Sequence, residues 1–286
     1  MTRRVAIVAV CLCAAAGCDE NAAHLRIAEA RRLSADLGVQ FTAATDAANR
    51  AVMADTDEGA MKFAQEARVA TEAVQSHAKA LASVLAQLDY PDETRLLEEF
   101  ERRFAEYRTL DSHILALALE GTNLEARQLS FGAVQEAADA FRDALDAVAP
   151  SNPAADSWRL KALAATALAG AREIQVLQAP HIAEPDDAEM TRLEMRMAAA
   201  ETAVRKALVR VGNLVSPKSR PEVAKATAAL DRLSSLNSEI KTLSRRNTNV
   251  RSLALSLGEK RTLTAACETA LRALQDALGK RGLPTR

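Results

Sequence analysis

The chain is poor in the residues that cross-link, kink or stack a protein: 4 Cys, 8 Pro, 10 Gly and 3% aromatic residues in a length of 286. Cys11, Cys13 and Cys18 all lie near the N-terminus, so a chain processed there keeps only Cys267 free and forms no internal disulfide. An apolar core drawn from the 49% hydrophobic residues must then hold the fold together. Much alanine and leucine with few helix breakers predicts an all-α protein.

Other absences exclude classes of function. The formal charge is −1, and no polybasic patch indicates nucleic-acid binding. A nucleophile with its base, a Gly-rich phosphate loop and a paired-carboxylate signature are all missing, so no enzyme is predicted. Cys-x-x-Cys-His and a recurring Glu-x-x-His pair are missing too, so neither covalent haem nor a di-iron centre, nor any other cofactor, is expected. Beyond the N-terminus no apolar stretch of about 18 residues is long enough to span a membrane.

The N-terminus carries an export signal. Arg3 and Arg4 precede an apolar run from Val5 to Ala16, which predicts a signal peptide over residues 1–17. The sequence Ala15-Ala16-Gly17-Cys18 resembles the bacterial lipobox, in which the cysteine takes a diacylglycerol and becomes the new N-terminus. The resemblance implies a lipid anchor at Cys18 and an extracytoplasmic location, on the periplasmic side or the cell surface. The usual lipobox has Leu where Ala15 stands, so a plain cleaved signal is the alternative.

The chain resembles itself at an offset of 126 residues. The segment from Thr122 to Ala147 matches that from Thr248 to Ala273, including the Thr-Asn pairs that open both segments. Shared alanine-rich composition is the alternative explanation. We therefore predict two copies, each an up-down-up-down four-helix bundle, over residues 18–150 and 151–286.

Breaks between the expected helices recur at intervals typical of bundles. They are predicted at residues 54–59, 89–92 and 121–123 in the first copy, 149–153 between the copies, and 179–187, 216–221 and 247–249 in the second. Thr122 and Glu125 have the spacing of a capping box.

Apolar residues in the last helix of each copy recur at alternating steps of three and four, the pattern of a bundle seam. Phe131 and Phe141 fall on the first seam, and Leu257 and Cys267 on the second. Cys267 is therefore interpreted as a small buried residue. Lys260 falls on the seam as well, where its stem is expected to extend past the end of the bundle. Trp158 is expected to anchor the junction between the copies.

Residues 92–149 bear a family likeness. An aromatic-containing helix with Phe104 and Tyr107 ends in a leucine-alanine run, the turn Gly121-Thr122-Asn123 follows, and a helix with Glu125-Ala126 near its start closes the copy. This pattern resembles the four-helix-bundle ligand-binding domain of methyl-accepting chemotaxis receptors. The likeness implies an extracytoplasmic sensing module, without the second transmembrane helix and the signalling hairpin of those receptors. No family binding residue carries over.

Polar residues at the expected helix turns are the candidate ligand site. In an up-down-up-down bundle the first and third turns share one end, which predicts two clusters that could bind a small polar solute or a divalent cation. The first cluster is Asp55, Thr56, Asp57 and Glu58 with Thr122 and Asn123, and the second is His181 and Glu184 with Thr248 and Asn249. The alternative is that these residues cap helices and stay solvated.

Histidines offer two weaker alternatives. His181 and Glu184 lie one helical turn apart and could ligate a metal, with His24, His77 or His113 as further ligands. His113 could also hold haem without a covalent link. We expect no metal site, because exposed or capping roles are simpler for all of them.

The sequence thus predicts a lipid-anchored sensory or ligand-binding module that signals only through a partner, which could be a membrane receptor or a second copy of the chain. A structural or scaffolding envelope lipoprotein without a small-molecule ligand is the alternative. A polar pocket between helices would favour the first, and an uninterrupted apolar core with an exposed apolar stripe would favour the second.

Overall fold

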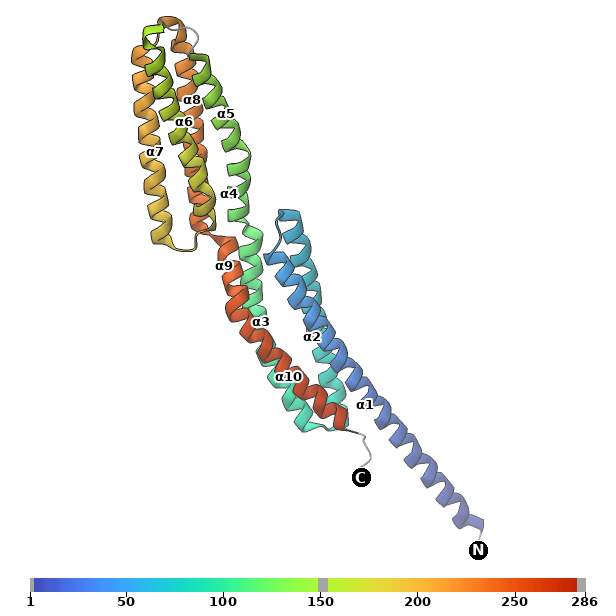
Figure 1. Ribbon diagram of the computed structural model, residues 1–286. Helices are drawn as coiled ribbons and strands as arrows, with labels where there is room; N and C mark the ends of the chain where they lie inside the picture. The colour runs from blue at the N-terminus through green and yellow to red at the C-terminus, as the bar shows by residue number, and fades with distance from the viewer. Residues whose placement is uncertain (1–2, 149–153, 282–286) are drawn as a thin grey trace. The chain divides into compact units, whose positions relative to one another are not determined.

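The computed structural model describes residues 3–148 and 154–281, and side chains within residues 22–148 and 157–281. All regular structure in these ranges is helical (Figure 1), which confirms the all-α class. The predicted anchor at Cys18 concerns a side chain outside the described ones. The predicted joining segment, residues 149–153, also lies outside the described residues.

The chain divides into two compact units, Met1–Leu119 with Ser252–Arg286 (unit 1) and Glu120–Arg251 (unit 2). Unit 1 contains α1 (Arg3–Val52), α2 (Asp57–Leu88), α3 (Pro91–Glu120, all but its last residue), the π-helical turn η3 (Ser256–Lys260) and α10 (Arg261–Lys280). Unit 2 contains α4 (Thr122–Phe131), α5 (Ala133–Val148), α6 (Ala154–Ala183), α7 (Asp187–Leu214), the short 3₁₀ turn η2 (Pro217–Ser219) and α8 (Arg220–Arg246). Helix α9 (Thr248–Leu255) crosses the boundary between the units.

These units do not follow the expected division at residue 150. The apolar face of α10, with Cys267, Leu271, Leu274 and Leu278, packs into one core with residues of α1, α2 and α3. Helices α4 and α5 share another core with α6, α7 and α8 instead. Unit 2 is therefore inserted in the sequence between α3 and the C-terminal part of unit 1. The apolar faces of α4 and α5, which precede residue 150, pack with helices that follow it, and α10, which follows residue 150, packs with helices that precede it.

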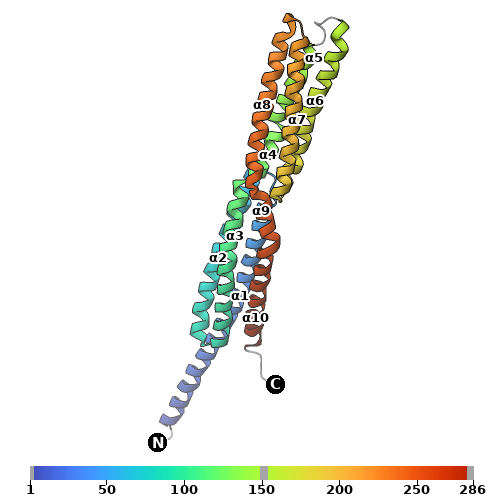
Figure 2. The same cartoon turned by 90° about the vertical axis from the view of Figure 1, so that its left-hand side faces the viewer.

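Unit 1 is a four-helix bundle of α1, α2, α3 and α10, which lie side by side in Figure 2. Phe41 of α1 makes edge contacts with Phe100, Phe104 and Tyr107 of α3, at ring-centroid distances from 5.2 to 6.1 Å. Arg281 closes the end of α10 by donating to both carboxylate oxygens of the buried Glu93, at 2.6 and 2.8 Å. These four aromatic side chains thus lie together in the core of unit 1, where each buries a large apolar area.

Unit 2 packs α4 and α5 with α6, α7 and α8 around alanine, leucine and valine. A Cβ atom on Gly170 of α6 would lie 2.6 Å from Val204 Cγ2 and 3.2 Å from the Ala200 carbonyl oxygen. Glycine therefore permits the close approach of α6 to α7. The seam predicted for the last helix of the first copy is confirmed for Phe141, which is fully buried.

Helices end at or just before each predicted break that lies in the described residues, although α6 extends into the break predicted at residues 179–187. α1 ends at Val52 before the first break, α2 ends at Leu88, and α8 ends at Arg246 before Asn247. Proline is tolerated in α6, which continues through Pro180 to Ala183. Gly121 and Asn247, which are 126 residues apart, both adopt a left-handed backbone, with φ of 61° and 56°. The two helix starts that follow them, Thr122 and Thr248, are therefore alike in backbone as well as in sequence.

Three predicted positions are wrong. Phe131 and Leu257 are 74% and 67% exposed, although both were placed on a bundle seam. The helix stops at Gly132 after Phe131, and the π-helical turn η3 rotates the side chains around Leu257, so a regular heptad does not run through either position. Trp158 is 66% exposed and does not anchor a junction, although the Arg159 guanidinium lies 5.4 Å from its ring centroid.

Among the described residues, no helix combines the length and the apolar character that crossing a membrane requires.

Candidate functional site

The residues predicted between the first two helices form a helix cap. Thr56 precedes α2 with an extended backbone, and its Oγ1 accepts a hydrogen bond from the Gly59 amide at 3.1 Å. Asp57 and Glu58 lie exposed in the first turn of α2, where carboxylates favour the positive end of the helix dipole. These three residues and Asp55 belong to unit 1, whereas Thr122 and Asn123 belong to unit 2. The first predicted cluster is therefore divided between the units.

Thr122, Asn123, Thr248 and Asn249 do meet, in unit 2, and they cap each other's helices. The Thr122 amide donates to Thr248 Oγ1 at 3.1 Å, and the Thr248 amide donates to Thr122 Oγ1 at 3.3 Å. The Asn123 amide donates to Asn249 Oδ1, and the Asn249 amide donates to Asn123 Oδ1, both at 3.1 Å. Each contact joins residues 126 positions apart, so equivalent residues of the two similar segments bind one another.

This reciprocal arrangement corrects the capping box predicted for Thr122 and Glu125. The N-cap of α4 is Gly121, which makes no side-chain cap, and the Thr122 hydroxyl faces Thr248. Buried amides and hydroxyls in the cluster satisfy one another, which is the requirement for polar groups removed from water. The four residues are thus structural in this arrangement.

His181 and Glu184 lie at the end of α6 beside the same cluster. Asn123 Nδ2 donates to the Ile182 carbonyl at 2.6 Å, and Asn247 Nδ2 donates to the Glu184 carbonyl at 2.9 Å. The His181 ring is fully buried, with Nε2 2.8 Å from Glu194 Oε1. The same Glu194 oxygen accepts from Arg245 Nε at 2.8 Å, and this hydrogen bond lowers the pKa of Glu194. His181 is therefore held in a protein network.

The described residues contain no group of three or more histidine, cysteine or acidic side chains arranged to hold a metal ion. His113, the alternative haem ligand, is exposed on α3. Cys267 is buried as predicted, and burial raises the pKa of its thiol to about 12.

A groove between α2 and α3 of unit 1 was not predicted. It has a volume of about 620 Å³, within the range of small-molecule sites. Its polar lining comes from both helices and comprises Arg68, Thr71, Glu72 and Gln75 of α2 with Arg108, Thr109, Asp111 and Ser112 of α3. Leu115 and Leu119 supply an apolar wall at one end. The groove therefore combines apolar surface with hydrogen-bonding groups of both charges.

One residue of this groove, Asp111, reaches into the core. Its side chain is 5% exposed and pairs with the 2%-exposed Lys260, with 2.7 Å between Oδ1 and Nζ. Lys260 ends the π-helical turn η3 and lies 5.7 Å from the Tyr107 ring centroid. Lys260 also lines another groove of unit 1, of about 520 Å³, beside α1. The expected extension of Lys260 past a bundle end is wrong, because η3 directs it inward.

This pair is incompletely hydrogen bonded. Asp111 Oδ1, Lys260 Nζ and Tyr107 Oη are all buried, and none has a hydrogen-bond partner of suitable geometry among the described residues. Burial raises the pKa of Asp111, and Lys260 opposes that shift. Burial and the Asp111 carboxylate raise the pKa of the Tyr107 hydroxyl. A buried charged pair of this kind is uncommon in the core of a folded protein.

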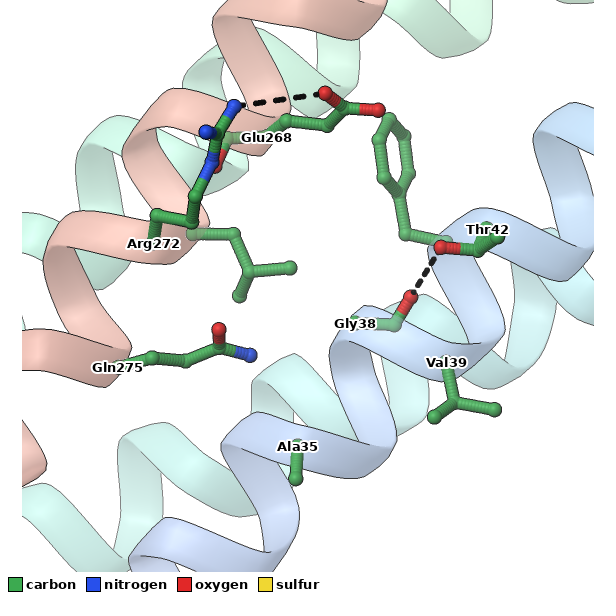
Figure 3. Close-up of a pocket in the computed structure, with 9 residues that line it drawn as sticks. Ala35, Gly38, Val39, Thr42, Glu268, Arg272 and Gln275 are labelled. Carbon is green, nitrogen blue, oxygen red and sulfur yellow. Dashed lines mark hydrogen bonds and ion pairs between the residues drawn. The ribbon is translucent and has the colours of Figure 1, made fainter.

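In a further groove of unit 1, several polar side chains are already paired within the protein. It lies between α1 and α10 with a volume of about 510 Å³. Figure 3 shows Arg272 directed towards Glu268 and the Thr42 hydroxyl towards the Gly38 carbonyl, at 3.6 and 3.0 Å. Gln275 Nε2 donates to the Ser34 carbonyl at 3.0 Å. The α2–α3 groove is therefore the stronger candidate site.

The α2–α3 groove could not be predicted from the sequence, because its arginines, glutamate and threonines have the spacing of an ordinary solvated helix face. The available signal was Asp111, which falls four residues after Tyr107 on the buried side of α3. A carboxylate in the apolar register of a helix needs a partner.

Neither a protein-family model nor a curated protein matches the chain. Among solved structures, the chain is similar to the TorS sensor domain in the crystal structure of the TorS sensor domain–TorT complex in the presence of TMAO. The TM-score is 0.50 at 12% sequence identity, covering 88% of this chain and 100% of that chain. The likeness concerns the fold, and it agrees with the all-helical class expected from the sequence.

Proposed function

We propose that this protein is an extracytoplasmic sensory module that binds a small molecule in the α2–α3 groove and acts through a partner protein. The observation that carries the proposal is Asp111, which lines that groove and whose buried carboxylate pairs with Lys260 at 2.7 Å. A pocket with a few convergent polar groups and a perturbed carboxylate is the usual form of a binding site.

The cores of both units favour this function over a passive spacer. A spacer needs only an uninterrupted apolar core, but unit 1 buries Asp111 and Lys260, and unit 2 buries Gln178 against Asn237, with Gln178 Nε2 3.0 Å from Asn237 Oδ1. Burying such groups opposes stability unless they are paired, so their presence is better explained by a role other than spacing.

The exposed apolar residues favour the scaffolding alternative, and they also fit the partner that a sensor needs. Phe131 and Trp158 of unit 2 and Leu257 of unit 1 are largely exposed. The similar TorS sensor domain was crystallised as a complex with TorT. We propose by analogy that this chain also acts in a complex, with a membrane receptor or a second copy as its partner, and without catalysis of its own. The resemblance to the ligand-binding domain of chemotaxis receptors supports the same proposed sensory function.

Lipid anchoring through Cys18 completes the proposal, and it is tested separately. In a bacterial host that lipidates exported proteins, the wild-type chain is expected in the membrane fraction and Cys18→Ser in the soluble fraction. A Cys18→Ser chain that stays with the membrane after a high-salt wash would contradict the anchor.

Native mass spectrometry tests the binding function. Residues 19–286 are purified from an exporting host and sprayed under gentle conditions. We expect a discrete added mass that denaturation removes. A bare chain, from several hosts and growth media, would contradict the sensory function and favour the scaffold.

A further inference from the structure

The α2–α3 groove presents charges of both signs on each of its walls. Arg68 and Glu72 lie one turn apart on α2, and Arg108 and Asp111 lie one turn apart on α3. Among the described residues, Glu72 and Arg108 form no ion pair, and Arg68 bonds only to Gln65 Oε1, at 2.5 Å. Three exposed charges at one groove thus remain available to a ligand.

The connection between the helices sets these charges across from one another. α2 and α3 run antiparallel through the tight turn at Asp89 and Tyr90. Arg68 precedes that turn by as many residues as Asp111 follows it, and Glu72 and Arg108 correspond almost as closely. Each level of the groove therefore sets a cation opposite an anion. Among the side chains that the structure describes on α2 and α3, no ion pair joins the two walls within 4.0 Å.

Asp111 adds a carboxylate at the inner side of the groove. The Asp111 carboxylate lies 2.7 Å from Lys260 Nζ on its buried side, and the residue also lines the groove. A positively charged nitrogen at the groove side of Asp111 would share the carboxylate with Lys260.

We propose that the α2–α3 groove binds a small zwitterion, a molecule that carries a positively charged nitrogen and an anionic oxygen. The nitrogen lies near Asp111 and Glu72, and the anionic oxygen lies near Arg68 and Arg108, with hydroxyls of Thr109 and Ser112 beside it. A ligand of one charge would leave half of the groove charges unmatched and desolvated, which costs affinity. This inference rests on the proposed function and specifies its ligand class.

Isosteric probes separate zwitterion binding from binding of one charge. Residues 19–286 are titrated by isothermal calorimetry with glycine betaine, trimethylamine N-oxide, glycine and β-alanine, and with two single-charge relatives of glycine betaine, choline and 3,3-dimethylbutyrate. We expect at least one zwitterion to bind and both single-charge probes to bind about tenfold more weakly or not at all. Equal binding of a single-charge relative, or no binding of any zwitterion, would overturn the inference.

Variants at exposed positions locate the binding without threatening the fold. Glu72→Gln and Arg108→Gln should each weaken binding of the same zwitterion by about tenfold, because each removes one charge-assisted contact. Arg95→Gln is the matched control, since Arg95 is exposed on α3 outside the groove. Unchanged affinity in both groove variants would overturn the assignment of the site.

The two proposals fail in different ways. If native mass spectrometry finds a bound molecule that is purely anionic, cationic or neutral, the sensory function stands and the zwitterion inference is wrong. If no molecule is bound and no probe binds, both are contradicted.

Discussion

At the scale of single residues, the central feature is the contact between Asp111 and Lys260. Asp111 lies on the buried side of α3 and was not predicted as a core residue, and Lys260, which lies far away along the chain, was assigned to a bundle end. The π-helical turn η3 brings Lys260 into the core of unit 1. A heptad pattern cannot predict such a turn, since Ser256–Lys260 contains no proline and only one glycine.

The pair should show strong coupling. Asp111→Leu or Lys260→Met alone leaves one buried charge without its partner, and each should lower the free energy of unfolding by about 3–5 kcal/mol. The double variant Asp111→Leu with Lys260→Met replaces both charges with apolar groups of similar size, and should return to within about 1 kcal/mol of the wild type. Urea unfolding measures all four chains, and additive losses in the double variant would contradict a direct pairing.

The ion pair between Glu93 and Arg281 should make the stability of unit 1 depend on pH in acid. Hydrogen bonds from Arg281 lower the pKa of Glu93 below its ordinary value of 4.5. Its contribution to stability is therefore complete above that ordinary pKa and is lost as the pH falls through the lower pKa of the folded state. As the pH falls through this window, the wild type should lose about 1 kcal/mol more unfolding free energy than Glu93→Gln does. An unchanged pH profile in urea unfolding would show that the ion pair does not form in solution.

At the scale of helices, most boundaries could be predicted and the irregular turns could not. Asp89, Pro91, Gly121 and Asn247 mark ends of helices by local chemistry alone, and the structure has breaks at each. The reciprocal caps could be predicted only in part. Thr-Asn pairs signalled helix starts, but their mutual bonding depends on the fold, because equivalent residues of the two segments meet in unit 2.

Reciprocal capping predicts coupling between two helix starts. Thr122→Val and Thr248→Val should each lower the unfolding free energy of unit 2 by about 1–2 kcal/mol, because each removes a cap and leaves a partner hydroxyl unpaired. The double variant should lose clearly less than the sum, since both changes remove the same contacts. Thr166→Val, at an exposed position of α6 whose hydroxyl bonds within its own helix, is the control and should change little. Fully additive losses in thermal or urea unfolding would contradict the cluster.

At the scale of the whole molecule, the repeat observed in the sequence and the compact units do not coincide. Copies divided at residue 150 were expected, whereas unit 1 takes α10 from the C-terminus and unit 2 is continuous between α3 and α10. Periodicity predicted which face of each helix is apolar. It could not predict which helices share a core, because alanine-rich and leucine-rich faces are interchangeable in a sequence pattern.

Excision distinguishes the two divisions. Residues 118–253, which contain unit 2, should unfold cooperatively by themselves, because their core is complete. Residues 19–150 should not, since they lack α10, whose Cys267, Leu271 and Leu274 fill the core of unit 1. Circular dichroism during heating compares the fragments. A cooperative transition in residues 19–150 alone would contradict the interleaved units.

The proposed function requires that a small molecule occupies the α2–α3 groove. The most direct measurement is a native mass spectrum of the wild type beside Ser112→Tyr, which fills the groove from an exposed position of α3, and Ser83→Tyr, an exposed control on α2 outside it. We expect the same added mass on the wild type and on Ser83→Tyr, and none on Ser112→Tyr. An added mass that persists on Ser112→Tyr, or is absent from all three, would contradict the claim.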